Sequence, residues 1–519
     1  MREKQWKISE EVYSGELQNQ LNVDHIIARL LKKRGIHSFE EAKTFFRPDL
    51  SQLHDPFLMK GMETAVSRIQ QAIAKDEKVL IYGDYDVDGT TAVSIVYSFF
   101  KDHIHHIAYY IPDRYKEGYG ISFAGIDFAA EHGYSLIIAL DCGIKAVDKI
   151  AYANSKKIDF IICDHHLPGN ELPEAVAILD QKQTDCHYPY KELSGAGIGF
   201  KLIQAFARVN GVNEEKCFKY LDLVATSIAA DIVPITGENR VLAYFGLEKI
   251  NKEPRPGIKA LLNFNQLKSP ATISTLVFTL GPRINAAGRI EHGSKAVELL
   301  TCEDEKLADE FALAINDTNL QRRDLALGIT TEAFEILDND NLSSTRRTTV
   351  LFNEKWHKGV IGIVASRLID KYYRPTIILT ESEGKITGSA RSVREYDVYS
   401  AIEKCSGLLE QFGGHKFAAG LTLKKENIEP FKTMFETVVA ESITEDQLIP
   451  KIEVDTELEF HEITGKLLRI LKQFAPHGPE NMTPVFCARN VFDTGWGQVF
   501  GNNHLKLELF QSSNPNLRF

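Results

Sequence analysis

Short apolar runs alternate with amphipathic segments through the first half of the chain. The runs lie within 78–86, 107–112, 135–143 and 159–166, and the stretches between them place apolar residues at helical spacing, as in 91–100. Runs of five or six apolar residues are typical of parallel strands buried on both faces. The pattern therefore predicts an α/β fold with a parallel sheet.

The flanking patterns predict the remaining parts of the chain. Helical spacing before residue 76 indicates a helical extension, and 304–338 holds no proline and one glycine, which favours one long connecting helix. A second strand–helix–strand pattern follows, and two-residue alternation then predicts a small β domain. The alternation is still running at Phe519, so we expect this β domain to be partial or truncated. The expected domains are 1–75, 76–303, 304–338 (the connecting helix), 339–445 and 446–519.

Composition is consistent with this division. At roughly 150 residues per domain, 519 residues with 44% hydrophobic content suggest three or four folded domains. The seven cysteines are scattered and never form a C-x-x-C pair, which disfavours a disulfide framework or a zinc knuckle. No stretch has the apolar length of a signal peptide or a membrane span, so we expect a cytoplasmic protein with no membrane partner.

The charge is unevenly distributed. Against 60 Lys and Arg stand 71 Asp and Glu, a net charge of −11, which argues against a chain bound throughout to polyanions. Residues 346–376, however, carry seven Lys or Arg and only two Asp or Glu. This segment is a candidate nucleic-acid contact, and a solvated helix face is the alternative.

Carboxylates follow the first apolar run at two-residue spacing. Asp84, Asp86 and Asp88 precede Gly89, as in a calcium-binding loop, but Ile95 stands where that loop needs a bidentate acid. Acids this close repel one another unless a cation neutralises them. A divalent metal site is therefore the economical interpretation.

Further acids and histidines follow the next runs. Asp141 ends one run, Asp164-His165-His166 ends another, and Asp231 lies inside an apolar segment. Each of them, taken alone, is explained equally well as a helix cap, a surface histidine pair or a paired acid. Because the carboxyl ends of parallel strands converge, they are expected to meet. Oxygen-rich ligation with one or two histidines suits Mn²⁺ or Mg²⁺, and two such ions form a device for hydrolysing phosphate esters.

The order of these motifs resembles a known family. GDYDVDGTT (83–91), DCG (141–143), DHH (164–166) and AADIVP (229–234) resemble motifs I to IV of the DHH phosphoesterase superfamily. Five further segments resemble motifs of its RecJ branch: YIPDRYKEGYG (110–120), GPRINAAGR (281–289), HKGVIGIVASRL (357–368), GSARS (388–392) and GGHKFAAG (413–420). The resemblance runs from about residue 25 to the end and implies a DHH catalytic domain, a DHHA1 substrate-binding domain and an OB-like domain.

The resemblance also implies roles for individual residues. His166 would face the scissile phosphate, Asp141 would bridge two ions, and Asp88 would hold the loop or a water at the metal. Leu80 stands where many superfamily members have a ligand histidine. The implied metal ligands are Asp84, Asp86, Asp141, His165 and Asp231. The implied catalytic residues are His166, Arg283, Asp88 and His415. The implied substrate-binding residues are Arg114, Tyr119, Asn285, Arg289, Ser389, Arg391, Ser392 and Gly414.

The function that the resemblance implies is 5′→3′ hydrolysis of single-stranded DNA with two Mn²⁺ (or Mg²⁺) ions, in recombination and repair. Its implied partners are single-stranded DNA, a single-strand-binding protein and a helicase. A nano-RNase or cyclic-dinucleotide phosphodiesterase is the nearest alternative, but such chains usually lack the helical extension and the β domain. A catalytically silent replication accessory protein is disfavoured by the retained acids. Aromatic residues of the β domain are candidates for base stacking or for its core: Phe486, Phe492, Trp496 and Phe500.

Overall fold

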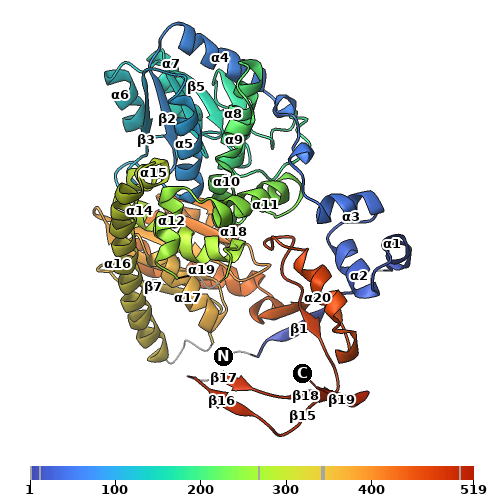
Figure 1. Cartoon of the computed structure of the whole chain (residues 1–519). Coiled ribbons are helices and arrows are strands. Elements are labelled where there is room, and N and C mark those ends of the chain that lie inside the picture. Colours follow the sequence, from blue (N-terminus) through green and yellow to red (C-terminus); the bar gives the residue numbers. More distant parts are fainter. Residues whose placement is uncertain (1–2, 11–12, 267–268, 341–344, 502–503, 519) are drawn as a thin grey trace. The chain divides into compact units, whose positions relative to one another are not determined.

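The computed structural model describes residues 3–10, 13–266, 269–340, 345–501 and 504–518 (Figure 1). The chain forms two compact units. One consists of Glu10–Asn319 with Asp455–Phe519, and the other of Met1–Ser9 with Leu320–Val454. Among the helices described, none is long and apolar enough to cross a bilayer.

A five-stranded parallel sheet forms the centre of the first unit. Its order is β3 (Ile107–Tyr110), β2 (Val79–Gly83), β4 (Leu136–Leu140), β5 (Asp159–Cys163) and β6 (Ala177–Leu179), and every neighbouring pair is parallel. The four predicted apolar runs are strands β2 to β5, so the parallel sheet is confirmed. The three-residue strand β6 was not predicted, because so short a run carries no periodic signal.

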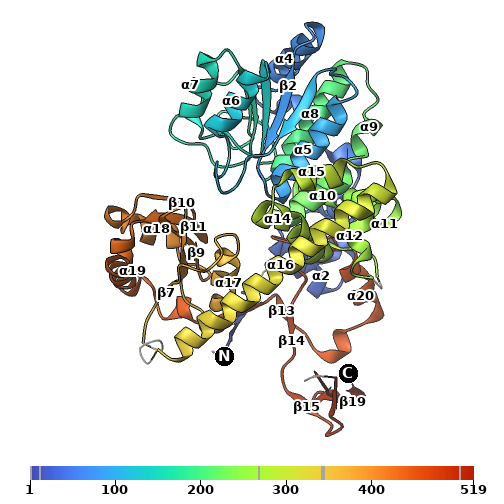
Figure 2. The same ribbon diagram turned by 90° about the vertical axis from the view of Figure 1, so that its left-hand side faces the viewer.

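Both faces of this sheet are covered, as Figure 2 shows. Alternate strand residues point to opposite faces, so Ile81 and Ile138 join one core while Leu80 and Ile137 join another. The first core is closed by α4 (Met62–Ala74), α5 (Val87–Phe100) and α8 (Gly195–Val209), and the second by α6 (Phe123–Glu131) and α7 (Val147–Ser155).

A helical stretch follows the sheet. It comprises α9 (Glu215–Phe218), α10 (Leu221–Ala230), α11 (Gly237–Lys252), α12 (Pro256–Asn263), α13 (Ile273–Thr275), a π-helical turn (Leu276–Leu280), α14 (Gly281–Ile290) and α15 (Ser294–Thr301). The predicted long helix is α16 (Glu305–Asp338). The N-terminal segment is helical in α1 (Gly15–Leu21), α2 (His25–Lys33) and α3 (Phe39–Phe46).

The second unit contains a mixed five-stranded sheet. Its order is β10 (Gln411–His415), β11 (Ala418–Leu423), β9 (Lys385–Arg391), β8 (Thr376–Ser382) and β7 (Thr349–Phe352). Only the β7–β8 pair is parallel. Helices α17 (Ile361–Tyr372), α18 (Val398–Glu403) and α19 (Ile428–Ser442) belong to this unit. The prediction for 1–75 contained helices and no strand, but β1 (Gln5–Ile8) is a strand and pairs in parallel with β12 (Lys451–Val454).

The C-terminal segment of the first unit consists of short strands and one helix, α20 (Gly465–Lys472). Its strands are β13 (Thr456–Glu457), β14 (Phe486–Cys487), β15 (Val491–Asp493), β16 (Gln498–Phe500), β17 (His504–Lys506), β18 (Leu509–Gln511) and β19 (Asn514–Arg518). Leu467 and Phe474 share a core with Ile27 and Leu30 of α2, so the N-terminal helices and the C-terminal segment stabilise each other. Phe486 packs on this core, whereas Phe492, Trp496 and Phe500 are 51%, 78% and 58% exposed.

One buried arginine links three parts of the first unit. The Arg240 guanidinium, on α11, donates to the carbonyl of Phe45 and lies 3.9 Å from the centroid of the Phe45 ring. It also donates to four successive carbonyls after α20, those of Gln473, Phe474, Ala475 and Pro476. Burial lowers the pKa of Arg240 to about 10. The N-terminal helices and the C-terminal segment are therefore fastened to α11 by one side chain.

Replacing this arginine tests its structural weight. Arg240→Met removes all five hydrogen bonds. Asn481 still donates to the carbonyls of Phe474 and Pro476. The carbonyls of Phe45, Gln473 and Ala475 lose this donor, and each buried acceptor left unsatisfied costs about 1–3 kcal/mol. We expect a loss of ~3 kcal/mol or more in the free energy of unfolding, measured by calorimetry. Lys252→Met, in the same helix at a side chain 69% exposed, is the control and should cost less than about 0.5 kcal/mol. Equal melting of the two variants would contradict this role.

Candidate functional site

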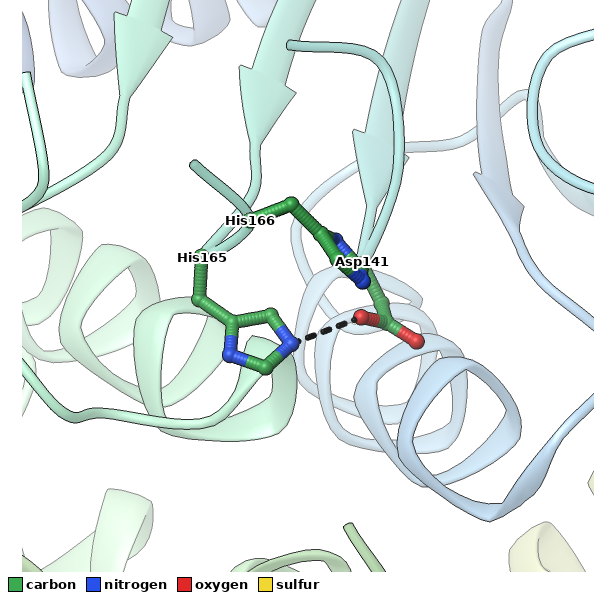
Figure 3. Close-up of side chains that lie close together, drawn as sticks. All are labelled: Asp141, His165 and His166. Carbon is green, nitrogen blue, oxygen red and sulfur yellow. Dashed lines mark ion pairs between the residues drawn. The ribbon is translucent and has the colours of Figure 1, made fainter. Parts of the chain in front are cut away.

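Acids and histidines from separate elements meet at the carboxyl edge of the parallel sheet. The His165 Nε2 atom, after β5, lies 3.2 Å from Asp141 Oδ1, 3.5 Å from Asp88 Oδ2 and 3.6 Å from Asp231 Oδ2. Figure 3 shows Asp141, His165 and His166 converging from neighbouring strand ends. Within the described part of the chain, two groups have ligand atoms within 4.8 Å of one another, and both include His165: one adds Asp141 and His166, the other Asp88 and Asp231.

The donor atoms of this cluster suit a metal. Among the described residues, both ring nitrogens of His165 and Oδ2 of Asp84 are buried without a hydrogen-bond partner. Unsatisfied buried polar atoms are costly in a folded protein. Carboxylate oxygens with one or two imidazoles match the preference of Mn²⁺ and Mg²⁺. The residues present therefore fit a divalent cation.

Electrostatics leads to the same conclusion. Burial, followed by the charge of Asp86, raises the pKa of Asp84 well above its ordinary range. Burial and then Asp88 raise the pKa of Asp141 in the same way. The pKa of Asp231 rises to about 8 through burial and then Asp88 and Asp86. Because each charge opposes the next, a cation is needed to keep all of these carboxylates ionised at neutral pH.

The first acidic loop is built tightly onto the end of β2. Asp84 Oδ1 accepts the amide of Tyr85 at 2.8 Å, and Asp86 caps α5 by accepting the amide of Gly89 at 3.0 Å. A Cβ on Gly89 would lie 2.4 Å from the Asp84 carbonyl oxygen, so only glycine fits there. Asp141 adopts a φ of 58°, a left-handed conformation that a non-glycine residue holds at a cost. Both loops are thus shaped to present carboxylates.

Asp88 has a different environment from the other acids. Its carboxylate accepts the amides of Gly195 at 2.7 Å and Ala196 at 2.8 Å, at the N-terminus of α8. It also accepts the Ser227 hydroxyl at 2.7 Å. Asp88 therefore anchors α8 beneath the cluster. Of the two roles expected for Asp88, the geometry favours holding the loop.

His166 is oriented by an acid that sequence reasoning did not assign. Asp164 Oδ1 lies 2.7 Å from His166 Nδ1, and Asp164 also accepts the amides of His165, His166 and Ile144. Burial opposes ionisation of Asp164, but the hydrogen bond and charge of His166 outweigh it and lower the pKa to about 2. Burial likewise opposes the charge on His166, and Asp164 raises its pKa to about 9. The signal for Asp164 was its place directly before two histidines.

The loop 111–122 brings further predicted residues to the cluster. The Tyr119 hydroxyl lies 3.4 Å from His166 Nε2, and the Arg114 guanidinium lies 5.0 Å from the centroid of the Tyr85 ring. On α14, a Cβ on Gly288 would lie 2.6 Å from the Tyr85 carbonyl oxygen, so this helix packs closely against the acidic loop. Asn285 and Arg289 lie on that helix, and the Arg289 carbonyl accepts the Tyr115 hydroxyl.

Arg283 is directed elsewhere. Its guanidinium donates to the Thr279 carbonyl at 2.8 Å, to Asn265 Oδ1 at 2.9 Å and to Asn316 Oδ1 at 3.1 Å. These contacts are with helices and connections of its own unit. The role implied for Arg283, that of a catalytic residue together with His166, stays a prediction.

The remaining predicted site residues lie in the second unit. A Cβ on Gly362 of α17 would lie 2.8 Å from Ser389 Oγ and 2.9 Å from an Arg391 terminal nitrogen. Both side chains therefore gather at the N-terminal turn of α17, where anions are favoured. Ser392 donates its amide to Phe417 at 3.0 Å. In the β10–β11 hairpin, Gly414 has a φ of 145° and pairs with Ala419, and His415 pairs with Ala418.

The basic segment 346–376 is largely committed to its own unit, contrary to the emphasis of the charge pattern. Arg346 pairs with Asp340 at 2.9 Å, Arg347 with Glu445, and Lys371 with Asp338 at 3.1 Å, while Arg374 is buried and donates to Thr349. Charge counted along the sequence includes these structural pairs, and a nucleic-acid contact by this segment stays a prediction.

Three family models match consecutive parts of the chain. The DHH family, N-terminal domain matches residues 78–228, the DHHA1 domain matches 346–441, and the RecJ OB domain matches 454–518. The first match includes Asp84, Asp141 and His165 but ends before Asp231, the second lies within the second unit, and the third spans most of the C-terminal segment.

Curated relatives and solved structures agree with these matches. The chain is 38% identical over 96% of its length to a single-stranded-DNA-specific exonuclease RecJ of Bacillus subtilis, and spans 63% of that relative. It is 34% identical to the protein of the same name from Dickeya dadantii, covering 93% of this chain and 86% of the relative. The structure of Thermus thermophilus RecJ with Mn²⁺ shares the fold, with a TM-score of 0.82 at 24% identity over 99% of this chain and 73% of that one. The chain therefore belongs to the RecJ family of the DHH phosphoesterases.

Proposed function

We propose that this protein is a metal-dependent exonuclease that degrades single-stranded DNA from the 5′ end during recombination and repair. The observation that carries the proposal is the convergence of Asp88, Asp141 and Asp231 on one buried His165 nitrogen, with donor atoms left unsatisfied. Membership of the RecJ family, whose relatives are named for activity on single-stranded DNA, supplies the substrate.

The metal would be held by Asp84, Asp86, Asp141, His165 and Asp231. When bound, two Mn²⁺ or Mg²⁺ ions would activate water near neutral pH and would neutralise charge on the phosphate. Structures of relatives in complex with Mn²⁺ and with Mg²⁺ support this choice of ion. With Leu80 four residues before Asp84, β2 offers no imidazole at that position.

The protein's own residues would orient the phosphate. His166, held at Nδ1 by Asp164, presents Nε2 toward the cluster edge as a donor to a phosphate oxygen. Tyr119 lies beside His166, and Arg114 lies over the Tyr85 ring. Both would receive the terminal nucleotide, with Asn285 and Arg289 on α14. Asp88 fixes the scaffold by anchoring α8.

The second unit would grip the strand. Ser389 and Arg391 at the N-terminal turn of α17 offer donors suited to a phosphodiester, together with Ser392, Gly414 and His415. The exposed Phe492, Trp496 and Phe500 of the C-terminal segment would stack on bases. We further propose a cytoplasmic setting in which a single-strand-binding protein and a helicase supply the substrate.

A substrate panel tests the function. Purified protein with Mn²⁺ is given single-stranded DNA labelled at the 5′ or the 3′ end, duplex DNA, dinucleotides and a cyclic dinucleotide. We expect labelled mononucleotide to appear first from the 5′-labelled single strand, with duplex DNA degraded at least about tenfold more slowly. Asp141→Asn is the inactive control. Activity confined to dinucleotides would overturn the proposal in favour of a nano-RNase.

The adjacent histidines provide a matched pair of variants. We expect His165→Ala to weaken Mn²⁺ binding by at least about 100-fold, because it removes the imidazole on which Asp88, Asp141 and Asp231 converge. His166→Ala should leave Mn²⁺ affinity within about threefold and lower kcat by about 100-fold or more, because it removes a donor to the phosphate. Calorimetric Mn²⁺ titration and single-turnover kinetics separate the two effects. Loss of Mn²⁺ binding in both variants would refute the division of roles.

The metal-free protein should become less stable as pH rises. The pKa of Asp231 is raised to about 8 in the folded protein, whereas an unfolded carboxyl titrates near 4. Between those values the folded state binds more protons, so stability falls as pH increases through this window. We expect Tm without metal to fall from pH 6 to pH 8, less so in Asp231→Asn, and Mn²⁺ to restore it.

The control for this measurement is Asp148→Asn, whose carboxylate is 65% exposed. It should show the same pH dependence as the unsubstituted protein. If Tm of Asp231→Asn fell between pH 6 and pH 8 as much as Tm of the unsubstituted protein, Asp231 would not contribute to the pH dependence of stability.

A further inference from the structure

The loop 111–122 is organised around one carboxylate, that of Glu117. Glu117 Oε1 accepts the Asp113 amide at 2.8 Å, near the start of the loop. Oε2 accepts the Ser122 hydroxyl at the end of the loop and lies 3.0 Å from the Tyr110 hydroxyl at the end of β3. A single side chain therefore ties both ends of the loop to the sheet.

A second anchor comes from the centre of the sheet. The buried Tyr82 of β2 donates its hydroxyl to the Gly120 carbonyl at 2.9 Å and accepts the Ser122 amide at 3.1 Å. Its ring stacks on that of Tyr110 at 5.4 Å. Ser122 in turn caps α6 by accepting the Gly125 amide at 2.9 Å, so its proton is directed to Glu117. The loop is thereby fastened to β2, β3 and α6.

This frame holds Tyr119 outward. Gly118 and Gly120 have φ values of 87° and 78°, so the chain turns on both sides of Tyr119. The Tyr119 side chain is 55% exposed, yet its hydroxyl reaches to 3.4 Å from His166 Nε2. Arg114, in the same loop, lies over the Tyr85 ring next to Asp84. The loop therefore carries the exposed Tyr119 and the half-buried Arg114 to the edge of the cluster without contributing a ligand.

We propose that Glu117 is a positioning residue that sets the affinity of the site for the end of the DNA strand by holding Tyr119 and Arg114 in place. The inference rests on the proposed function, since it assumes that these two side chains receive the substrate. An ionised carboxylate is required because only an acceptor without protons can serve the Tyr110, Asp113 and Ser122 donors together. An amide would direct an NH₂ group at one of them.

The test compares Glu117→Gln with Glu131→Gln, an exposed residue at the end of α6. We expect Glu117→Gln to raise KM for single-stranded DNA about tenfold while kcat, Mn²⁺ affinity and Tm change little. Glu131→Gln should match the unsubstituted protein. In a Tyr119→Ala and Arg114→Ala background, Glu117→Gln should raise KM no further, because its effect passes through those side chains.

Hydrogen exchange of the amides in 113–120 gives a readout independent of catalysis. We expect these amides to exchange faster in Glu117→Gln while those of β2 and β4 do not change. Faster exchange with an unchanged KM would overturn the positioning role, as would a full additional effect in the doubly substituted background. If the unsubstituted protein did not cleave single-stranded DNA, the proposed function would fail, whereas the exchange result would still report on the loop.

Discussion

Mutual repulsion of carboxylates crowded at one edge of the sheet is the constraint around which the first unit is built. Asp84, Asp141 and Asp231 each have a raised pKa because burial and neighbouring acids both oppose their charge. A fold that tolerates this must supply rigid strands to hold the acids and a cation to compensate them. The all-parallel sheet meets the first need, since its carboxyl edge gathers side chains that are distant in sequence.

A second layer of residues fixes the first. The Asp88 carboxylate accepts hydrogen bonds from two amides at the N-terminus of α8 and from the Ser227 hydroxyl. The Asp164 carboxylate contacts the His166 ring and accepts three backbone amides. Neither arrangement leaves the acid free to move, so both define the position of a neighbour rather than meet the substrate. The scaffold extends further through Arg240, which fastens the C-terminal segment to the same unit.

The parallel sheet, the long helix α16 and the family were predictable from the sequence, because long periodic runs and ordered motifs are strong signals. The convergence at the strand ends followed from topology. Hydrogen-bond partners were not predictable: nothing in the spacing showed that Asp164 orients His166 or that Arg283 is held by Asn265 and Asn316. Charge counted along the chain did not show which basic residues of 346–376 are paired, because ion pairs form between residues far apart in sequence.

The central claim is that the carboxylates and His165 at the sheet edge form the metal centre. Crystals of the protein grown with Mn²⁺ and measured at the manganese absorption edge test it most directly. We expect an anomalous peak within coordination distance of the Asp141 carboxylate and His165 Nε2, with a second ion close to it. A fully occupied Mn²⁺ elsewhere in the molecule, with no peak at Asp141, would contradict the account.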